Sequence, residues 1–328
     1  MPEQTVDAAH SMTCMEIWGG NRGTSRSITL PGLDAWVYSR PYQQAESGGD
    51  VYYVSNCATG RITRLMLADV SGHGSAVAKT ANQLRMLMRR YVNHIQQLKF
   101  VSSMNDEFAA ISDSGRFATA VVATFLAPTR RLTFSNAGHP SPLIYTARDR
   151  KWRLLQGVAD QAGRRRGPSD LPWGILENGI YAELQLELEV GDLVLFYTDA
   201  LIESYNSDGE LLGPQQFLEI VSALDVATPE TLLTQIVERI TPLHPGNLTQ
   251  DDVTMLLFRA TGEAARVPFK NRLLAPFRLL KGMAVSLMSG GRGMPLPEFS
   301  IANLGIDFTS NEKSGHTSEP VAGKTPSD

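Results

Sequence analysis

The sequence contains few cysteines, no long uncharged apolar run and no excess of basic charge. Cys14 and Cys57 are the only cysteines in 328 residues, too few for a disulfide framework or a thiolate metal site. No uncharged apolar run approaches the roughly 20 residues that a membrane-spanning helix needs. Residues 1–16 are polar and acidic and lack the basic and apolar blocks of a signal peptide. We therefore expect a cytoplasmic protein, soluble or at most peripheral to a membrane.

Charge is unevenly distributed along the chain, whose formal net charge is −4. Residues 264–297 hold six basic residues and no acids, which leaves 24 basic and 34 acidic residues elsewhere. An acidic body argues against nucleic acid as a partner. With 42% hydrophobic residues, the chain can bury a sizeable core in one large domain or two small ones.

Apolar periodicity predicts strands and helices in a mixed order. Residues 1–30 are expected to form a loose N-terminal arm, and residues 156–179 a loop. Helices are predicted around Val77–Ile95 and Val101–Ile111, and two more follow Ala200, the second with Thr228 as its cap and Pro229 as its first residue. Strands are predicted at residues 33–39, 50–57, 61–69, 117–126, 130–136, 142–146, 181–189, 193–200 and 251–260.

This order is not the strict alternation of strand and helix that a parallel sheet requires. Strands come in pairs, followed by pairs of helices, and the chain contains no internal repeat. The pattern therefore predicts an α+β fold, a sandwich of two mainly antiparallel sheets with helices on the outside.

Four aspartates stand at the ends of apolar strands. Asp50 opens one strand after two glycines, Asp69 and Asp199 each close one, and Asp251, beside Asp252, opens the last. If these strand ends meet at one rim, the carboxylates repel one another unless a cation lies between them. Oxygen-rich sites of this kind suit Mg²⁺ or Mn²⁺, and a pair of such ions activates water for attack on phosphorus. The alternative for any single acid is a turn residue or a helix cap.

Six segments resemble the PPM-type metal-dependent Ser/Thr protein phosphatases, in particular the bacterial SpoIIE/RsbU-like branch. They occur in the family's order across about residues 33–260 and read "SGGDVYYV", "LADVSGHGSAVA", "ATAVVATF", "LTFSNAGHPSPLIY", "LVLFYTDALIES" and "TQDDVTMLLFR". The resemblance implies an αββα sandwich at residues 31–260 that hydrolyses phosphoserine or phosphothreonine with two Mn²⁺ or Mg²⁺ ions and no covalent phosphoenzyme. One departure is Ala200, which stands where the family's "TDG" has glycine.

The resemblance also implies the site residues and the substrate class. Asp50, Asp69, Asp199 and Asp251 would bind the metals, with the carbonyl of Val70 as a further ligand, and Asp252 would be a neighbour. The substrate would be a phosphorylated regulatory protein, such as an anti-sigma-factor antagonist of the STAS fold.

Two further groups of residues have competing interpretations. His73 is either a general acid for the departing serine oxygen or a turn residue bonded to local backbone, whereas His139 is expected to hold the turn before Pro140. Arg164, Arg165 and Arg166 form a solvated face or, if their loop folds over the metals, bind the substrate's phosphate.

The C-terminal part is predicted to contain a basic amphipathic segment at residues 261–310 and a disordered tail at residues 311–328. Within residues 266–288 the segment either binds an anionic membrane or a partner, or packs on its own domain. Two alternatives to an enzyme remain at this point, a catalytically silent phosphoprotein-binding module and a peripheral membrane scaffold. The apolar face of the segment comprises Phe269, Leu273, Phe277, Leu280, Ala284 and Leu287, and basic residues occupy the other faces.

Overall fold

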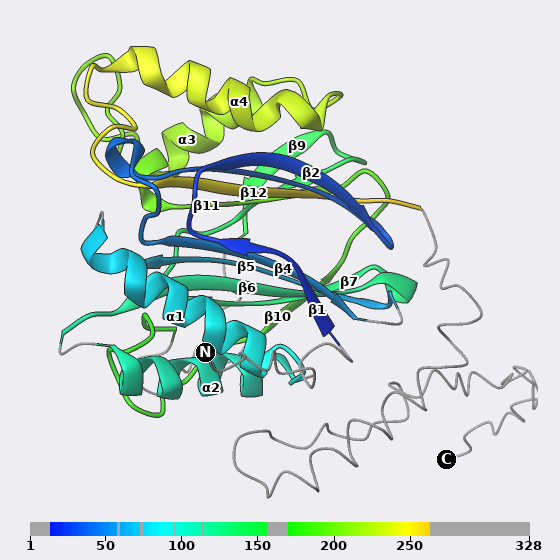
Figure 1. The fold of residues 1–328 in the computed structure, drawn as a ribbon. Coiled ribbons are helices and arrows are strands. Elements are labelled where there is room, and N and C mark those ends of the chain that lie inside the picture. The colour runs from blue at the N-terminus through cyan, green and yellow to red at the C-terminus, as the bar shows by residue number, and fades with distance from the viewer. Residues whose placement is uncertain are drawn as a thin grey trace, which may run out of the picture. The chain divides into compact units, whose positions relative to one another are not determined.

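Two antiparallel six-stranded sheets lie face to face in the computed structural model, which describes residues 14–57, 60–72, 75–94, 96–112, 115–155 and 170–262 (Figure 1). The first sheet has the order β1 (Cys14–Gly20), β4 (Asp50–Cys57), β5 (Ile62–Val70), β6 (Ala118–Leu126), β7 (Arg131–Ala137) and β10 (Leu184–Glu187). The second has the order β2 (Thr24–Leu30), β3 (Leu33–Arg40), β12 (Val253–Ala260), β11 (Leu193–Tyr197), β8 (Leu143–Thr146) and β9 (Lys151–Leu154).

Two pairs of helices cover the outer faces of the sheets. Helices α1 (Ser75–Tyr91) and α2 (Gln97–Ile111) lie against the first sheet, and α3 (Gly213–Ser222) and α4 (Pro229–Ile240) lie against the second (Figure 1). Each helix has an apolar stripe, which it buries by facing a sheet. The predicted αββα sandwich is therefore confirmed.

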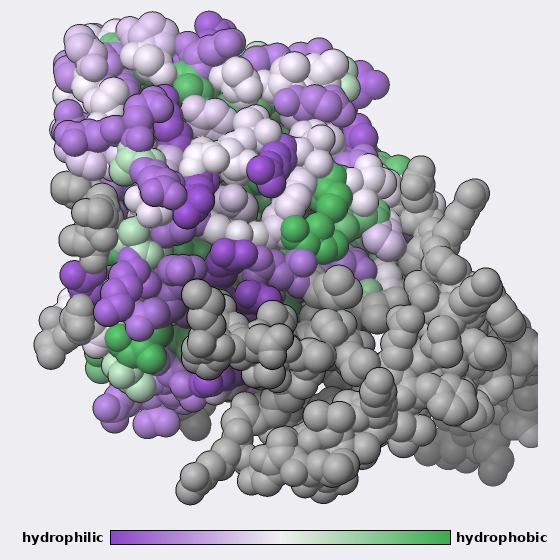
Figure 2. All heavy atoms as spheres, in the orientation of Figure 1, coloured by the Kyte–Doolittle hydropathy of each residue, from purple (hydrophilic) through white to green (hydrophobic). Residues whose placement is uncertain are grey.

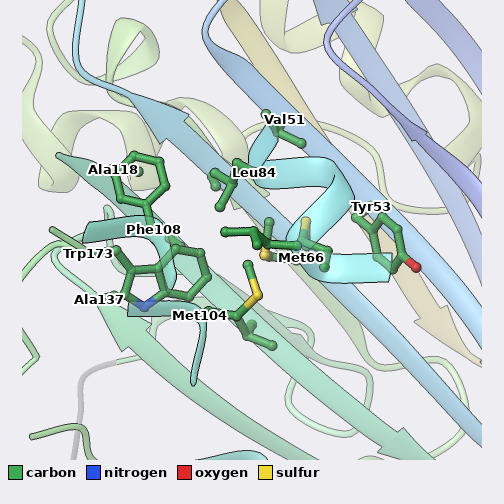
Figure 3. Packing of buried hydrophobic residues seen from close by; sticks show 14 of the residues in the cluster. Val51, Tyr53, Met66, Leu84, Met104, Phe108, Ala118, Ala137 and Trp173 are labelled. Carbon is green, nitrogen blue, oxygen red and sulfur yellow. The ribbon is translucent and has the colours of Figure 1, made fainter. Parts of the chain in front are cut away.

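Three buried clusters hold the layers together. In the cluster under α1 and α2, Met66 of β5, Leu84 of α1 and Met104 of α2 point toward one another, and Trp173 closes one side (Figure 3). A second cluster fills the space between the two sheets, and a third lies under α3 and α4. On the face drawn in Figure 2, the hydrophobic side chains of the described residues form only small separate patches among hydrophilic ones. This layering explains the sequence patterns of the strands: alternating apolar residues belong to a strand buried on one face, and a continuous apolar run to a strand buried on both.

The prediction of a loose arm over residues 1–30 is wrong for residues 14–30, which form β1 and β2. Both are edge strands, and β2 buries only Leu30 fully. An edge strand that buries little apolar surface has a weak hydrophobic pattern, so periodicity did not reveal it.

Other differences are smaller. The predicted strand at residues 181–189 is regular only over Leu184–Glu187, and β9 had not been predicted. Helix α4 begins at Pro229 as predicted, with Thr228 before it, but the Thr228 side chain makes no capping hydrogen bond. None of the helices in the described ranges combines the length and hydropathy needed to cross a bilayer. The basic segment and the tail lie outside the described residues, apart from residues 261 and 262.

The packing of α2 on the first sheet makes a testable prediction about stability. Met104 is fully buried, whereas Leu98 on the same helix is 41% exposed. Met104→Ala should lower the free energy of unfolding by about 2–5 kcal/mol because it leaves a cavity. The matched variant Leu98→Ala should change it by less than about 0.5 kcal/mol. Urea unfolding followed by circular dichroism measures both, and equal losses would contradict the assigned packing.

A candidate metal centre at the rim of the two sheets

Asp50 and Asp69 face each other across neighbouring strands of the first sheet. They are register partners at the paired ends of β4 and β5. Asp50 is buried, and burial raises the pKa of its carboxyl well above the usual range, as do the charges of Asp69 and Asp252. Directly opposed like charges in a sheet are destabilising, so this pairing is a cost that the fold tolerates.

The second sheet contributes further acids to the same rim. Asp199 follows β11 in a 3-10 turn over Asp199–Leu201, and Asp251 precedes β12. Burial raises the pKa of Asp69, and the charges of Asp199, Asp251, Asp252 and Glu203 raise it further. Asp69 thus lies within electrostatic range of the other three aspartates singled out in the sequence.

Asp252 has a different position from its neighbour Asp251. Its two carboxylate oxygens accept backbone hydrogen bonds, one from Tyr42 at 2.6 Å and one from Gly49 at 2.5 Å. A Cβ at Gly48 would collide with this carboxylate. Asp252 therefore fastens the segment before β4 to the start of β12, and glycine is required where the two approach.

The turn after β5 approaches the rim through its backbone. The carbonyl oxygen of Val70 would lie 2.9 Å from a Cβ at Gly49, so only glycine leaves the space beside that oxygen open. Gly72 has φ of +99°, a conformation that side chains other than glycine rarely adopt. His73 follows directly, but it lies outside the described residues, as do Arg164, Arg165 and Arg166.

Thr198 links the two sheets through Asp50. Its hydroxyl donates to Asp50 Oδ2 at 3.0 Å and accepts a hydrogen bond from the backbone N–H of Thr254 at 3.0 Å. Thr198 is fully buried at the end of β11. A buried hydroxyl with both functions satisfied holds the carboxylate in one orientation.

His139 lies in the connection between β7 and β8 and lines the same pocket as Asp199. It closes a turn with Asn136, in which the His139 N–H donates to Asn136 Oδ1 at 2.7 Å and Asn136 Nδ2 donates to the His139 carbonyl at 2.8 Å. Its Nδ1 lies 2.8 Å from Thr119 Oγ1, and Thr119 is the register partner of Asp69. Burial lowers the pKa of His139 to about 3, partly offset by the backbone of Tyr197. These contacts match the predicted role of His139 in holding the turn.

The donor chemistry of the rim fits divalent cations. The acidic side chains offer carboxylate oxygens as ligands. Within the described residues, no Lys or Arg forms an ion pair with Asp50, Asp69 or Asp199. A hard cation with oxygen ligands is the natural counter-charge for such a group. In the part of the chain that the structure describes, no three acidic, His or Cys side chains are already arranged to chelate one ion. The rim therefore has the charge and the ligand type for metal, and the side chains would adjust on binding.

Sequence reasoning missed three contributors to this rim. Glu203 lies one turn after Asp199, and its N–H donates to the Asp199 carbonyl at 2.8 Å. Its position four residues after Asp199 could have indicated from the sequence that the two side chains lie near each other. Thr198 and Thr254 carried no such signal, because a threonine in a buried strand is common.

Comparison with protein-family models identifies the family. The model described as stage II sporulation protein E (SpoIIE) matches residues 59–261. Among curated proteins, the chain is 23% identical over 257 residues to protein IcfG of Synechocystis sp., covering 70% of this chain and 38% of IcfG. It is 22% identical over 228 residues to the phosphoserine phosphatase RsbU of Bacillus subtilis, covering 69% of this chain and 63% of RsbU. The chain thus spans less than two thirds of the length of either relative.

Solved structures share the fold at low sequence identity. The PP2C phosphatase domain of SpoIIE from Bacillus subtilis gives a TM-score of 0.59 at 14% identity, covering 72% of this chain and 70% of the other. The RsbU and RsbW domains of a Mycobacterium tuberculosis protein give 0.57 at 21% identity, covering 80% and 71%. The SiaA-PP2C domain of Pseudomonas aeruginosa gives 0.57 at 17% identity, covering 69% and 85%.

The contact between Gly48 and Asp252 predicts a stability effect. Gly48→Ala should lower the free energy of unfolding by about 1–3 kcal/mol, because the displaced carboxylate leaves the buried N–H of Gly49 without its acceptor. Gly23→Ala is the matched control, since its Cβ would meet its nearest atom at 3.5 Å, an ordinary contact. Urea unfolding of both variants tests this, and an unaffected Gly48→Ala would show that the approach is not needed.

The burial of His139 predicts how it titrates. Its pKa of about 3 in the folded protein lies below the roughly 6.5 of an unfolded chain. The unfolded state therefore takes up the proton first as pH falls, and stability is lost from about pH 6.5 toward pH 3. Nitrogen-15 NMR of the imidazole ring at pH 5 should show the neutral form. A charged ring at pH 5, with the protein still folded, would contradict the assigned burial.

Proposed function

The chain belongs to the SpoIIE family, and from that premise we propose that it is a metal-dependent protein phosphatase that hydrolyses phosphoserine or phosphothreonine. The observation that carries the proposal is the convergence of Asp50 and Asp69 from one sheet with Asp199 and Asp251 from the other. Such a concentration of carboxylates is costly in an apoprotein and useful in a metal enzyme.

The ligands proposed for two Mn²⁺ or Mg²⁺ ions are Asp50, Asp69, Asp199 and Asp251, with the carbonyl of Val70. Asp252 is assigned a structural role, because both its oxygens already accept backbone N–H groups. When bound, the metal pair would supply Lewis-acid activation of water for attack on phosphorus.

The chain's own residues prepare the site for that chemistry. Thr198 holds Asp50 in one orientation, and the glycines at 48 and 49 let backbone approach the rim. Burial and neighbouring acids disfavour ionisation of Asp69 in the absence of a cation, so a cation that binds there would also keep it ionised. The position of Asp69 beside acids from both sheets supports this ligand set.

The substrate is proposed to be a phosphorylated regulatory protein, such as a STAS-type anti-sigma-factor antagonist. The support is the resemblance of the six sequence segments to the SpoIIE/RsbU-like branch, together with the similarity to RsbU, which is named a phosphoserine phosphatase. His73 as general acid and Arg164, Arg165 and Arg166 as phosphate ligands complete the proposal. A cytoplasmic location, with a membrane or partner contact through residues 266–288, is the corresponding proposal for the rest of the chain.

A silent phosphoprotein-binding module is the competing function. It has no need for so many acids at one rim, and this favours the enzyme. Release of p-nitrophenolate from p-nitrophenyl phosphate distinguishes the two. The enzyme turns the compound over in Mn²⁺ and stops when the metal is chelated, whereas the binding module is inactive in both conditions.

Asp69 provides the sharpest variant for this proposal. Asp69→Asn should lower kcat on p-nitrophenyl phosphate by ~10²-fold or more, because one metal ligand is lost. The variant should also bind Mn²⁺ more weakly in calorimetry and unfold at equal or higher urea concentration without metal, since one repulsive charge is gone.

Asp208→Asn, at an exposed loop position, is the matched control and should behave as wild type. Full activity of Asp69→Asn would remove this residue from the site.

A further inference from the structure

A pocket of ≈ 450 Å³ opens beside Asp199, at the edge of the acidic rim. Its walls come from β6, the β7–β8 connection, the end of β9 and the turn after β11. The volume falls within the roughly 300–1,000 Å³ of typical ligand pockets, so it has room for a side chain and its neighbouring backbone. The described residues that line it include Thr119, His139, Pro140, Leu154, Asp199 and Ile202.

The lining is mainly uncharged. Among the described residues of the wall, Asp199 is the only one that carries charge at neutral pH, since burial keeps His139 neutral. Leu154, Ile202 and Pro140 give the wall an apolar surface, and Thr119 and Ser141 add hydroxyl groups. A pocket of this composition favours a ligand group without charge.

The position of the pocket relates it to the proposed reaction. Asp199 belongs both to the pocket wall and to the acidic rim, so a group held at the rim lies next to the pocket mouth. In an extended peptide, consecutive Cα atoms are about 3.8 Å apart, so a residue beside the phosphorylated one can reach a space adjoining the phosphate.

We propose that this pocket is the subsite for the side chain next to the phosphorylated residue of a protein substrate, and that it selects an uncharged, apolar side chain. The proposal rests on the proposed phosphatase function and adds to it a sequence preference. Any ionised side chain there, acidic or basic, loses hydration against Leu154 and Ile202, whereas an apolar side chain does not.

The experiment uses the full chain in Mn²⁺ and phosphoserine peptides that differ only in one flanking residue: Leu, Lys or Glu. We expect kcat/KM for the Leu peptide to exceed that for the Lys and Glu peptides by at least about tenfold, since methylene-scale pocket contacts alone give 10-fold or more. p-Nitrophenyl phosphate, which has no flanking residue, is assayed in parallel. Turnover of that compound with equal kcat/KM for the three peptides overturns the subsite alone, and no turnover of any substrate overturns the proposed function and the subsite together.

Two substitutions at one wall residue test the assignment directly. Leu154→Lys places a cation in the pocket and should lower the Leu-to-Glu ratio of kcat/KM by about tenfold or more. Leu154→Ala removes bulk and should shift the preference from Leu toward Phe in a corresponding peptide pair, which keeps the test open if the lysine variant does not fold. Val190→Lys is the matched control, because Val190 is 55% exposed and lies in the turn before β11, at the opposite end of that strand from Asp199. Wild-type ratios in both Leu154 variants overturn the proposal.

Discussion

Electrostatic repulsion among the carboxylates at the rim is the constraint on which the rest of the site depends. Antiparallel pairing sets Asp50 opposite Asp69, and the second sheet adds Asp199 and Asp251 to the same region. Burial raises the pKa of Asp50 and Asp69, and the charges of neighbouring acids raise it further. The hydrophobic layers on both sides must hold these two carboxyl groups in place against this cost. A fold with three buried clusters can bear this cost, and a bound divalent cation would turn it into binding energy.

Hydrogen bonds of uncharged groups, within and between the sheets, fix the segments around the acids. Thr198 holds Asp50 from the end of β11, Asp252 fastens the segment before β4, and His139 joins its turn to Thr119 on β6. All three residues are buried. Thr198 and His139 are uncharged, and the carboxylate of Asp252 accepts hydrogen bonds from backbone N–H groups. The rim is thereby shaped by neutral donors, which leaves its negative charge available to a cation.

The same arrangement connects the proposed chemistry with substrate selection. Asp199 stands between the acidic rim and the mainly uncharged pocket, so the turn after β11 borders both. In the proposed enzyme, metal ions held at the rim would bind the phosphate, and the pocket would accept the side chain of the neighbouring residue.

The sequence by itself determined the fold class and the four acids, because continuous and alternating apolar runs report which strands are buried and an acid at the end of such a run is conspicuous. It did not reveal β1, β2 or β9, whose burial is too slight to leave a pattern. Only the tertiary structure decided that Asp252 binds backbone, that Thr198 orients Asp50 and that His139 lies against a pocket. Such roles depend on contacts between residues far apart in the chain, such as Asp50 and Thr198. The stacking of the two sheets decides which distant residues meet, and local sequence patterns do not record it.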